Sequence, residues 1–139
     1  MKIAVGFDER TKVTDKVVDY LEKKRLEFEV SKVEAWPDVA REVARKVSSG
    51  KFDQGILLCW TGTGTSMAAN KVKGIRAALV WNPWIAKGAR RWNDANILVM
   101  SSKKTELEMV EKILNAWFKV KTFDSNESEN ITKLKDEDK

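Results

Sequence analysis

Residues 54–71 constrain the fold of this chain more than any other part of the sequence. They begin with a short apolar run, residues 56–59, of the length expected for a strand buried on both faces. A loop of glycine, threonine and serine follows at residues 61–66, and a helix is expected to begin near Met67. This order is typical of a parallel α/β sheet, in which ligands bind at the carboxyl edge of the strands.

The glycine loop supports two interpretations, a ligand site or a plain connection. Glycines let backbone N–H groups approach a ligand closely, and a helix N-terminus adds positive potential. Cys59 would lie where the strand meets this loop. Such a loop is nevertheless more often a connection, and a lone buried cysteine usually packs as a small hydrophobic residue. The loop lacks the Gly-Lys-Ser/Thr of a P-loop, and Met67 replaces the third glycine of a dinucleotide fingerprint.

Apolar segments alternate with amphipathic ones along most of the chain. Besides the central strand, strands are expected at residues 2–7, 26–33, 75–80 and 97–100. Helices are expected at residues 12–24, 36–48 and 82–91, and beyond Thr105, where Thr105 and Glu108 form a capping-box pattern. Five strands separated by helices predict a three-layer α/β/α, Rossmann-like fold with a five-stranded parallel sheet.

The chain is expected to contain one domain and a tail. Residues 1–123 form a single α/β domain in this prediction, because no repeat or change of composition interrupts them. After Phe123 the sequence becomes polar, and residues 124–139 carry six acidic side chains and three lysines. We expect this C-terminal tail to be disordered, or ordered only against a partner.

Composition argues against several classes of site. The 139 residues include one cysteine and no histidine, so we expect no intramolecular disulfide, metal centre or cofactor. No apolar run approaches the length of a membrane span, and the chain goes straight into a strand pattern, so we expect a cytoplasmic protein. The net charge is +5, but basic and acidic residues are interspersed as on a solvated surface, so a nucleic-acid partner is not expected.

A series of motifs resembles the family of ribose-5-phosphate isomerase type B and the galactose-6-phosphate isomerase subunits. The resemblance covers about residues 1–120. The motifs, in order, are a first strand ending in Asp8, then Trp36-Pro37-Asp38, Gly55-Ile56-Leu57-Leu58-Cys59, Thr61-Gly62-Thr63-Gly64, Ala68-Ala69-Asn70-Lys71-Val72, Gly74-Ile75-Arg76-Ala77-Ala78-Leu79 and Asn93-Asp94-Ala95-Asn96.

The resemblance implies an aldose–ketose isomerase that acts on a sugar or sugar phosphate through an enediol. It implies Cys59 as the base between C1 and C2, with Thr61 and Asp8 as further catalytic residues. The substrate-binding positions that it implies are Glu9, Trp60, Gly62, Thr63, Gly64, Thr65, Asn70, Trp92, Asn93 and Lys103. It also implies a homodimer or homotetramer, because the family builds its site across a dimer interface.

Several of these positions depart from the family pattern. Family histidines correspond here to Glu9, Trp81 and Trp92. The glycine after the cysteine is Trp60, and the arginine after the fifth strand is Lys103. The C-terminal arginines that hold the substrate phosphate have no counterparts, so we expect a weaker dependence on a phosphate group. The alternative function is a catalytically impaired member that binds a sugar or another small polar ligand without turnover.

Overall fold

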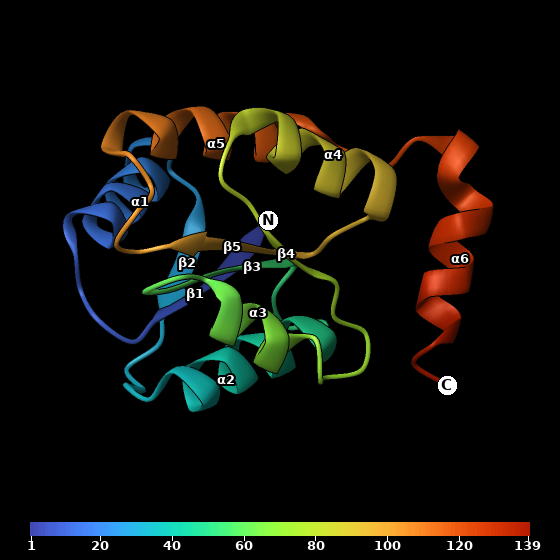
Figure 1. Ribbon diagram of the computed structural model, residues 1–139, viewed down its shortest axis with the longest axis horizontal. Helices are drawn as coiled ribbons and strands as arrows, with labels where there is room; N and C mark the ends of the chain where they lie inside the picture. The colour runs from blue at the N-terminus through green and yellow to red at the C-terminus, as the bar shows by residue number, and fades with distance from the viewer.

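A computed structural model describes all 139 residues of the chain (Figure 1). The strands are β1 (Lys2–Phe7), β2 (Glu27–Val30), β3 (Gln54–Cys59), β4 (Ala77–Leu79) and β5 (Ile97–Ser101). The helices are α1 (Lys12–Lys23), α2 (Trp36–Ser48), α3 (Thr63–Ala69), α4 (Pro83–Asn93), α5 (Leu107–Lys119) and α6 (Ser128–Asp136), with a short 3₁₀ turn, η1 (Ser125–Glu127).

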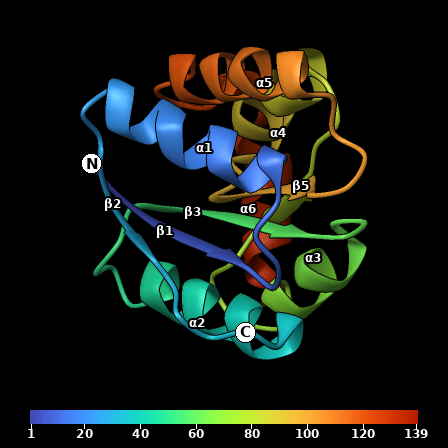
Figure 2. The same cartoon turned by 90° about the vertical axis from the view of Figure 1, so that its left-hand side faces the viewer.

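The sheet confirms the predicted architecture. Its strand order is β2-β1-β3-β5-β4, and every neighbouring pair is parallel. Helices α1, α4 and α5 cover one face, and α2 and α3 cover the other (Figures 1 and 2). All six residues of β3 are buried, as predicted for a strand covered on both faces. The loop after β3 therefore lies in the middle of the carboxyl edge.

Each face of the sheet has its own apolar core. Under α5, Trp117 is fully buried, and its indole Nε1 donates a hydrogen bond of 2.9 Å to Gln54 Oε1, which satisfies the polar end of the ring. On the other face, α2 packs so closely on β1 that a Cβ at Gly6 would lie 2.5 Å from Val39 Cγ1. This close packing fixes the end of β1, from which Asp8 emerges.

The start of α3 differs from the prediction. The helix begins at Thr63, four residues before Met67, and Gly62 caps it with φ at 82°. A side chain at Gly62 would clash with Leu79 of β4, so both the backbone angle and the available space require glycine there. The periodic pattern missed this because glycine and threonine are weak helix formers, and the packing of the loop overrides their preferences.

The predicted capping box before α5 is wrong. The Thr105 hydroxyl donates to the Ser101 carbonyl oxygen at 2.6 Å instead of capping the helix. Helix α5 begins after Glu106 without a side-chain cap. A capping box forms at α1 instead, where the hydroxyls of Thr11 and Thr14 accept hydrogen bonds from each other's backbone N–H.

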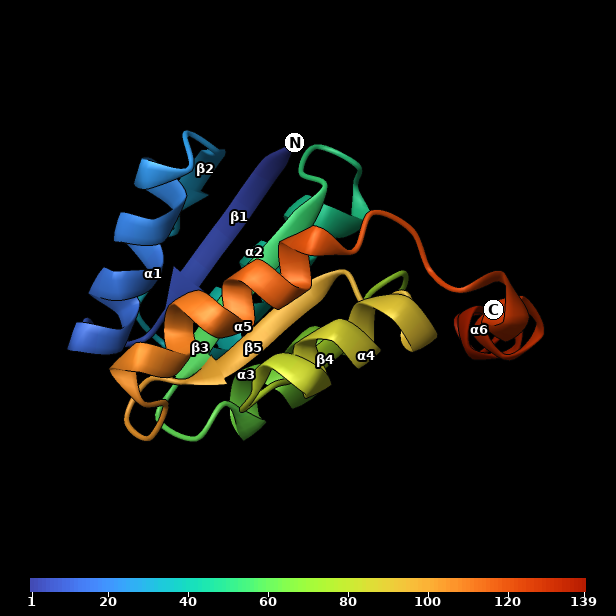
Figure 3. The same cartoon turned by 90° about the horizontal axis from the view of Figure 1, so that it is seen from above.

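The C-terminal tail, which was expected to be disordered or ordered only against a partner, forms helix α6 in the single chain. Figures 1 and 3 show α6 at the end of a long connection, set apart from the sheet. Ile131 is buried, Lys135 Nζ lies 2.8 Å from Asp94 Oδ2, and the Gly74 amide donates to Asp138 Oδ2 at 2.8 Å. These contacts tie α6 to the loops before β4 and β5. None of the helices combines the length and the apolar character that a membrane span requires.

Candidate functional site

The loops after β1, β3 and β5 meet at the carboxyl edge of the sheet. Phe7 pairs with Leu58, so Asp8 and Cys59 follow at the same level on neighbouring strands, which lie about 5 Å apart. On the other side of β3, Cys59 pairs with Ser101. The structure therefore brings two of the three predicted catalytic residues, Asp8 and Cys59, to the same place.

Cys59 is held at the junction of β3 and the glycine loop. Its side chain is buried, and the Thr65 hydroxyl donates to Cys59 Sγ at 3.4 Å. The same hydroxyl lies 3.4 Å from the Gly62 carbonyl oxygen, and the Ser102 amide donates to the Cys59 carbonyl oxygen at 2.8 Å. The sulfur is thus fixed beside the first turn of α3, where Thr65 itself is fully buried.

The glycine loop presents hydroxyl groups and backbone amides beside Cys59. The hydroxyls of Thr61 and Thr63 are 2.6 Å apart, and the Thr63 amide donates to Thr61 Oγ1 at 3.2 Å. Gly64 lies against the Trp36 ring, because a Cβ on Gly64 would be only 3.0 Å from the nearest ring carbons. First-turn amides of a helix have no intrahelical carbonyl partner, so this end of α3 suits an oxygen that gains negative charge.

Asp8 carries an unsatisfied oxygen. Asp8 Oδ1 is buried and has no hydrogen-bond partner. Burial raises the pKa of the Asp8 carboxyl above its usual value, and the neighbouring charge of Glu9 adds to this, against the opposing effects of backbone hydrogen bonds and Lys103. A carboxyl of this kind keeps its proton to higher pH than an ordinary aspartate and can exchange a proton with a bound oxygen.

Glu9, Trp60 and Lys103 form a cluster, the Glu9–Trp60–Lys103 cluster, across the same loops. Trp60 Nε1 donates to Glu9 Oε2 at 2.5 Å, and Lys103 Nζ lies 3.4 Å from Glu9 Oε2 and 5.1 Å from the Trp60 ring centroid. The hydrogen bond from Trp60, with the charge and hydrogen bond of Lys103, lowers the pKa of the Glu9 carboxyl. The Glu9 carboxylate thus lies between Trp60 and Lys103 at the surface, and Trp60 remains 60% exposed.

Two serines at the end of β5 were missed by the sequence analysis. The Ser101 hydroxyl donates to the Trp60 carbonyl oxygen at 2.5 Å and accepts from the Lys104 amide at 2.8 Å. The Ser102 side chain is buried, and its hydroxyl has no hydrogen-bond partner. Their position after the fifth strand was the available signal, since the carboxyl ends of parallel strands share one edge.

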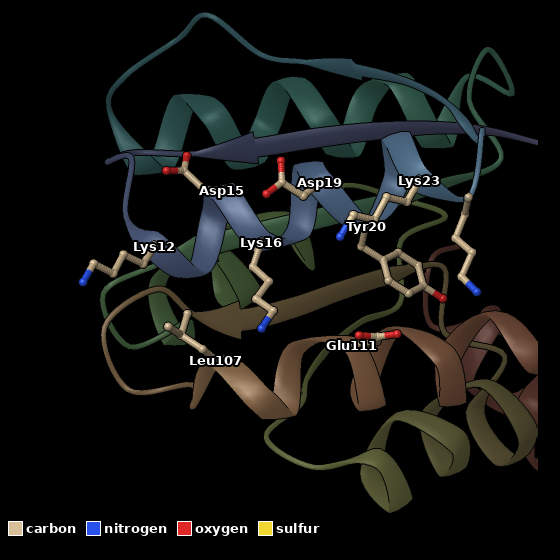
Figure 4. Close-up of a pocket in the computed structure, with 9 residues that line it drawn as sticks. Lys12, Asp15, Lys16, Asp19, Tyr20, Lys23, Leu107 and Glu111 are labelled. Atoms are coloured by element: carbon tan, nitrogen blue, oxygen red, sulfur yellow. The ribbon is translucent and has the colours of Figure 1, made fainter.

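A cavity of about 360 Å³ lies beside the glycine loop, between β4, β5 and α5. Thr61, Trp81 and Ser101 contribute to its walls. A separate groove of about 450 Å³ lies between α1 and α5, where Figure 4 shows lysines and carboxylates mixed along the exposed side of α1. That groove contains none of the predicted site residues, so the carboxyl edge remains the candidate site.

Three predicted site residues lie elsewhere in the single chain. The Asn70 side chain accepts from the Ala77 amide at 2.8 Å and donates to the Ala77 carbonyl oxygen at 3.0 Å, so it holds the start of β4. Trp92 and Asn93 end α4, just before β5, and the Trp92 ring packs edge-on against Trp84. All three are thus near the amino edge of the sheet, at the opposite end from Cys59.

Residues 3–134 match the model of a family described as Ribose/Galactose Isomerase. The chain is 36% identical to a ribose-5-P isomerase B of Listeria innocua, over 84% of this chain and 83% of that protein. It is 34% identical to a D-erythrulose-4-phosphate isomerase of Pectobacterium atrosepticum, over 84% and 82% of the two chains. A crystal structure of a ribose 5-phosphate isomerase from Thermotoga maritima superimposes with a TM-score of 0.89 at 37% identity, covering 97% of each chain.

Proposed function

Since the chain belongs to the Ribose/Galactose Isomerase family, we propose that it is an aldose–ketose isomerase for a sugar phosphate, with Cys59 as the base. The observation that supports this role is the position of the Cys59 sulfur. It lies at the carboxyl end of the central strand, beside the first turn of α3, and Asp8 follows the neighbouring strand β1 at the same level. A base, a proton donor and amides for an oxyanion are thereby gathered at one point.

In the proposed reaction, the Cys59 thiolate removes the proton from C2 of the open-chain aldose. The electron pair moves into a C1–C2 double bond, and O1 becomes the oxyanion of a cis-enediolate. The first-turn amides of α3 and the Thr61 hydroxyl stabilise this oxygen. Asp8 moves the hydroxyl proton between O2 and O1, and Cys59 returns its proton to C1. One C–H and one O–H bond are broken and remade, so the ketose is an isomer of the aldose.

The alternative, a family member that binds a sugar without turnover, rests on the absence of histidine. The proposed steps at C1 and C2 use no imidazole, because Cys59, Asp8 and the loop supply the base, the acid and the oxyanion donors. We therefore favour an active enzyme. Turnover by the purified protein separates the two functions, since the alternative predicts binding alone.

A second copy of the chain would complete this site in our proposal. Trp92 and Asn93 cannot reach Cys59 within one chain, because they end α4 at the opposite edge of the sheet. Several large apolar side chains are exposed in the single chain, among them Met67, Trp81 and Trp84 at 63–64%. Burying them between two copies is favourable, and a two-fold dimer places the same residues at two equivalent sites. We thus propose a homodimer or a dimer of dimers.

We also propose a cytoplasmic location. The base is a free thiol, and thiols remain reduced in the cytoplasm but form disulfides in oxidising compartments. The relatives named above act, by their names, on phosphates of a five-carbon and a four-carbon sugar, so the proposed function covers sugar phosphates of both lengths.

The experiment that tests the proposed function follows proton exchange at C1 and C2. The protein is incubated in D₂O with a ketose phosphate, D-ribulose 5-phosphate, and the products are followed by NMR. We expect formation of the aldose phosphate. Deuterium should appear at C2 of this product, because C2 receives the proton when the reaction starts from the ketose. Absence of both, with ligand-dependent stabilisation against heating retained, would favour the non-catalytic alternative.

A further inference from the structure

A five-carbon aldose phosphate has to be opened before Cys59 can act on it. In water such a sugar is mostly a cyclic hemiacetal, and only its open-chain aldehyde can form the enediol of the proposed reaction. In ring opening, a base takes the proton of the anomeric hydroxyl, the bond between C1 and the ring oxygen breaks, and an acid protonates that oxygen. Catalysis of this step therefore needs one acid and one base besides the groups that act at C1 and C2.

The cavity beside the glycine loop lies close to the proposed base. Its volume of about 360 Å³ falls within the range of small-molecule sites. Two of its lining residues, Thr61 and Ser101, locate it relative to Cys59. Thr61 follows Cys59 by two residues, and Ser101 pairs with Cys59 on the neighbouring strand, about 5 Å away. A sugar in this cavity therefore lies against the same two strand ends as the proposed reaction.

Lys104 and Glu106 are the ionisable side chains that line this cavity. Both are exposed, and neither is engaged by another side chain. Lys104 forms a hydrogen bond only through its backbone amide, which donates to Ser101 Oγ at 2.8 Å. Glu106 precedes α5 without capping it, and its carbonyl oxygen accepts from the Met109 amide at 2.9 Å. Both backbones are thus anchored, while an ammonium that donates protons and a carboxylate that accepts them remain free.

The other hydroxyl groups of the cavity wall are occupied by the backbone of the loops. The Ser101 hydroxyl donates to the Trp60 carbonyl oxygen at 2.5 Å, and the Thr105 hydroxyl donates to the Ser101 carbonyl oxygen at 2.6 Å. Their protons hold the end of β5 in place and are not available to a ligand. Proton transfer inside this cavity is therefore left to Lys104 and Glu106.

Trp81 gives the cavity a flat apolar wall. The residue lines the cavity and is 63% exposed in the single chain, and Leu79 and Met109 continue the apolar lining. The C–H face of a sugar ring packs well on an aromatic ring, while its hydroxyls turn toward polar groups. The second copy proposed above would cover the exposed side of Trp81 and close the cavity around such a ring. Its lining thus suits a cyclic sugar.

From these observations, and resting on the isomerase function proposed above, we propose that this cavity binds the cyclic form of an aldose phosphate and that Glu106 and Lys104 open the ring. The Glu106 carboxylate takes the proton of the anomeric hydroxyl, and the O–H electron pair forms the aldehyde C1=O1 bond. The bond between C1 and the ring oxygen breaks, and that oxygen takes its proton from the Lys104 ammonium. Exchange with water then restores both side chains, and the aldehyde proceeds to Cys59.

The test separates ring opening from the chemistry at C1 and C2. D-Ribose 5-phosphate is mostly cyclic, whereas in D-ribulose 5-phosphate the hydroxyl needed for a five-membered ring carries the phosphate. Conversion of ribose 5-phosphate therefore requires both steps, but exchange of the C1 hydrogen of ribulose 5-phosphate in D₂O requires only the enediol. For Glu106→Gln, we expect kcat/KM with ribose 5-phosphate to fall at least about tenfold more than the exchange rate. Glu108→Gln, at an exposed position outside the cavity, is the matched control and should leave both rates unchanged.

A second variant distinguishes proton donation from charge. Lys104→Arg keeps the positive charge, but arginine does not release a proton near neutral pH, so this variant should lose turnover of ribose 5-phosphate as Glu106→Gln does. Full turnover by Lys104→Arg would overturn the role of Lys104 as acid. Equal losses of conversion and of C1 exchange in Glu106→Gln would overturn the role of Glu106 at the ring. Absence of C1 exchange with the unmodified protein would instead contradict the isomerase function, and this proposal with it.

Discussion

The hydroxyl of Thr65 donates a hydrogen bond to the sulfur of Cys59 across 3.4 Å. Thr65 belongs to the first turn of α3 and is fully buried, whereas Cys59 ends β3. The bond therefore fixes the sulfur relative to the amides that would receive the oxyanion. One hydrogen bond therefore positions both the base and the oxyanion donors.

Replacing Cys59 by alanine should abolish isomerisation without unfolding the protein. The thiol is small and buried, so the substitution costs little packing, whereas loss of a general base typically costs roughly a hundredfold or more in rate. The measurement is kcat/KM for an open-chain sugar phosphate, with circular dichroism as the control for folding. A folded variant within about tenfold of the wild-type rate would remove Cys59 from the role of base.

Thr65→Val should lower kcat more than it raises KM. Valine keeps the shape of threonine but has no hydroxyl, so the sulfur loses its donor while the helix remains packed. We expect a loss of roughly tenfold in kcat, the order of one hydrogen bond to a charged group. Thr65→Ser keeps the hydroxyl and is the matched control, which should retain most of the activity. Equal losses in the two variants would point to packing instead of the hydrogen bond.

Asp8→Asn should stabilise the fold at neutral pH while impairing turnover. Burial raises the pKa of Asp8 in the folded state above its usual 3.8, so the folded protein binds this proton more tightly than the unfolded chain. The contribution of Asp8 to stability is therefore fully present below pH 3.8 and is lost as the pH rises through the folded pKa. Melting temperatures of wild type and variant should converge at low pH. Toward neutral pH they should separate, with the variant melting at the higher temperature.

The fold could be predicted from the sequence because the apolar and amphipathic patterns agree with the burial of the strands and helices. The apolar run ending at Cys59 is short and uninterrupted, which identified the central strand and hence the carboxyl edge. Side-chain partners could not be predicted in this way. Thr105 has a hydroxyl that satisfies either a helix cap or the Ser101 carbonyl, and only the position of β5 decides between them. Glu9 and Trp60 are 51 residues apart, so their hydrogen bond depends on the assembled sheet.

The amide of Asn70 illustrates a different limit. Its motif suggested contact with substrate, but in the chain it makes two hydrogen bonds to the backbone of Ala77. A short polar side chain near an edge strand can take either role, and the sequence pattern does not indicate which one applies.

The helix of the tail, α6, was also not predicted from the sequence. Its stability comes from single contacts such as that of Lys135 with Asp94, which composition does not reveal.

Gln54→Leu should destabilise the protein by about 1–3 kcal/mol, because it leaves the buried indole N–H of Trp117 without an acceptor. Chemical denaturation measures the loss. Trp117→Phe removes the donor itself, so the double variant should cost less than the sum of the two single ones. Strict additivity of the two losses would show that the hydrogen bond contributes nothing to the free energy of unfolding.

A shared site makes a specific prediction for mixed dimers. Asn93 is exposed at the end of α4, away from Cys59 of its own chain. If it faces Cys59 of a second copy, Asn93→Glu should impair activity by placing a carboxylate in that site.

Cys59→Ala and Asn93→Glu proteins, each inactive alone, should then recover activity when unfolded together and refolded. In a mixed dimer, one site carries both substitutions and the other carries none. Random pairing makes about half of the dimers mixed, so about a quarter of the wild-type activity should return. Full activity of Asn93→Glu alone, or no recovery on mixing, would show that each chain forms its site without the other.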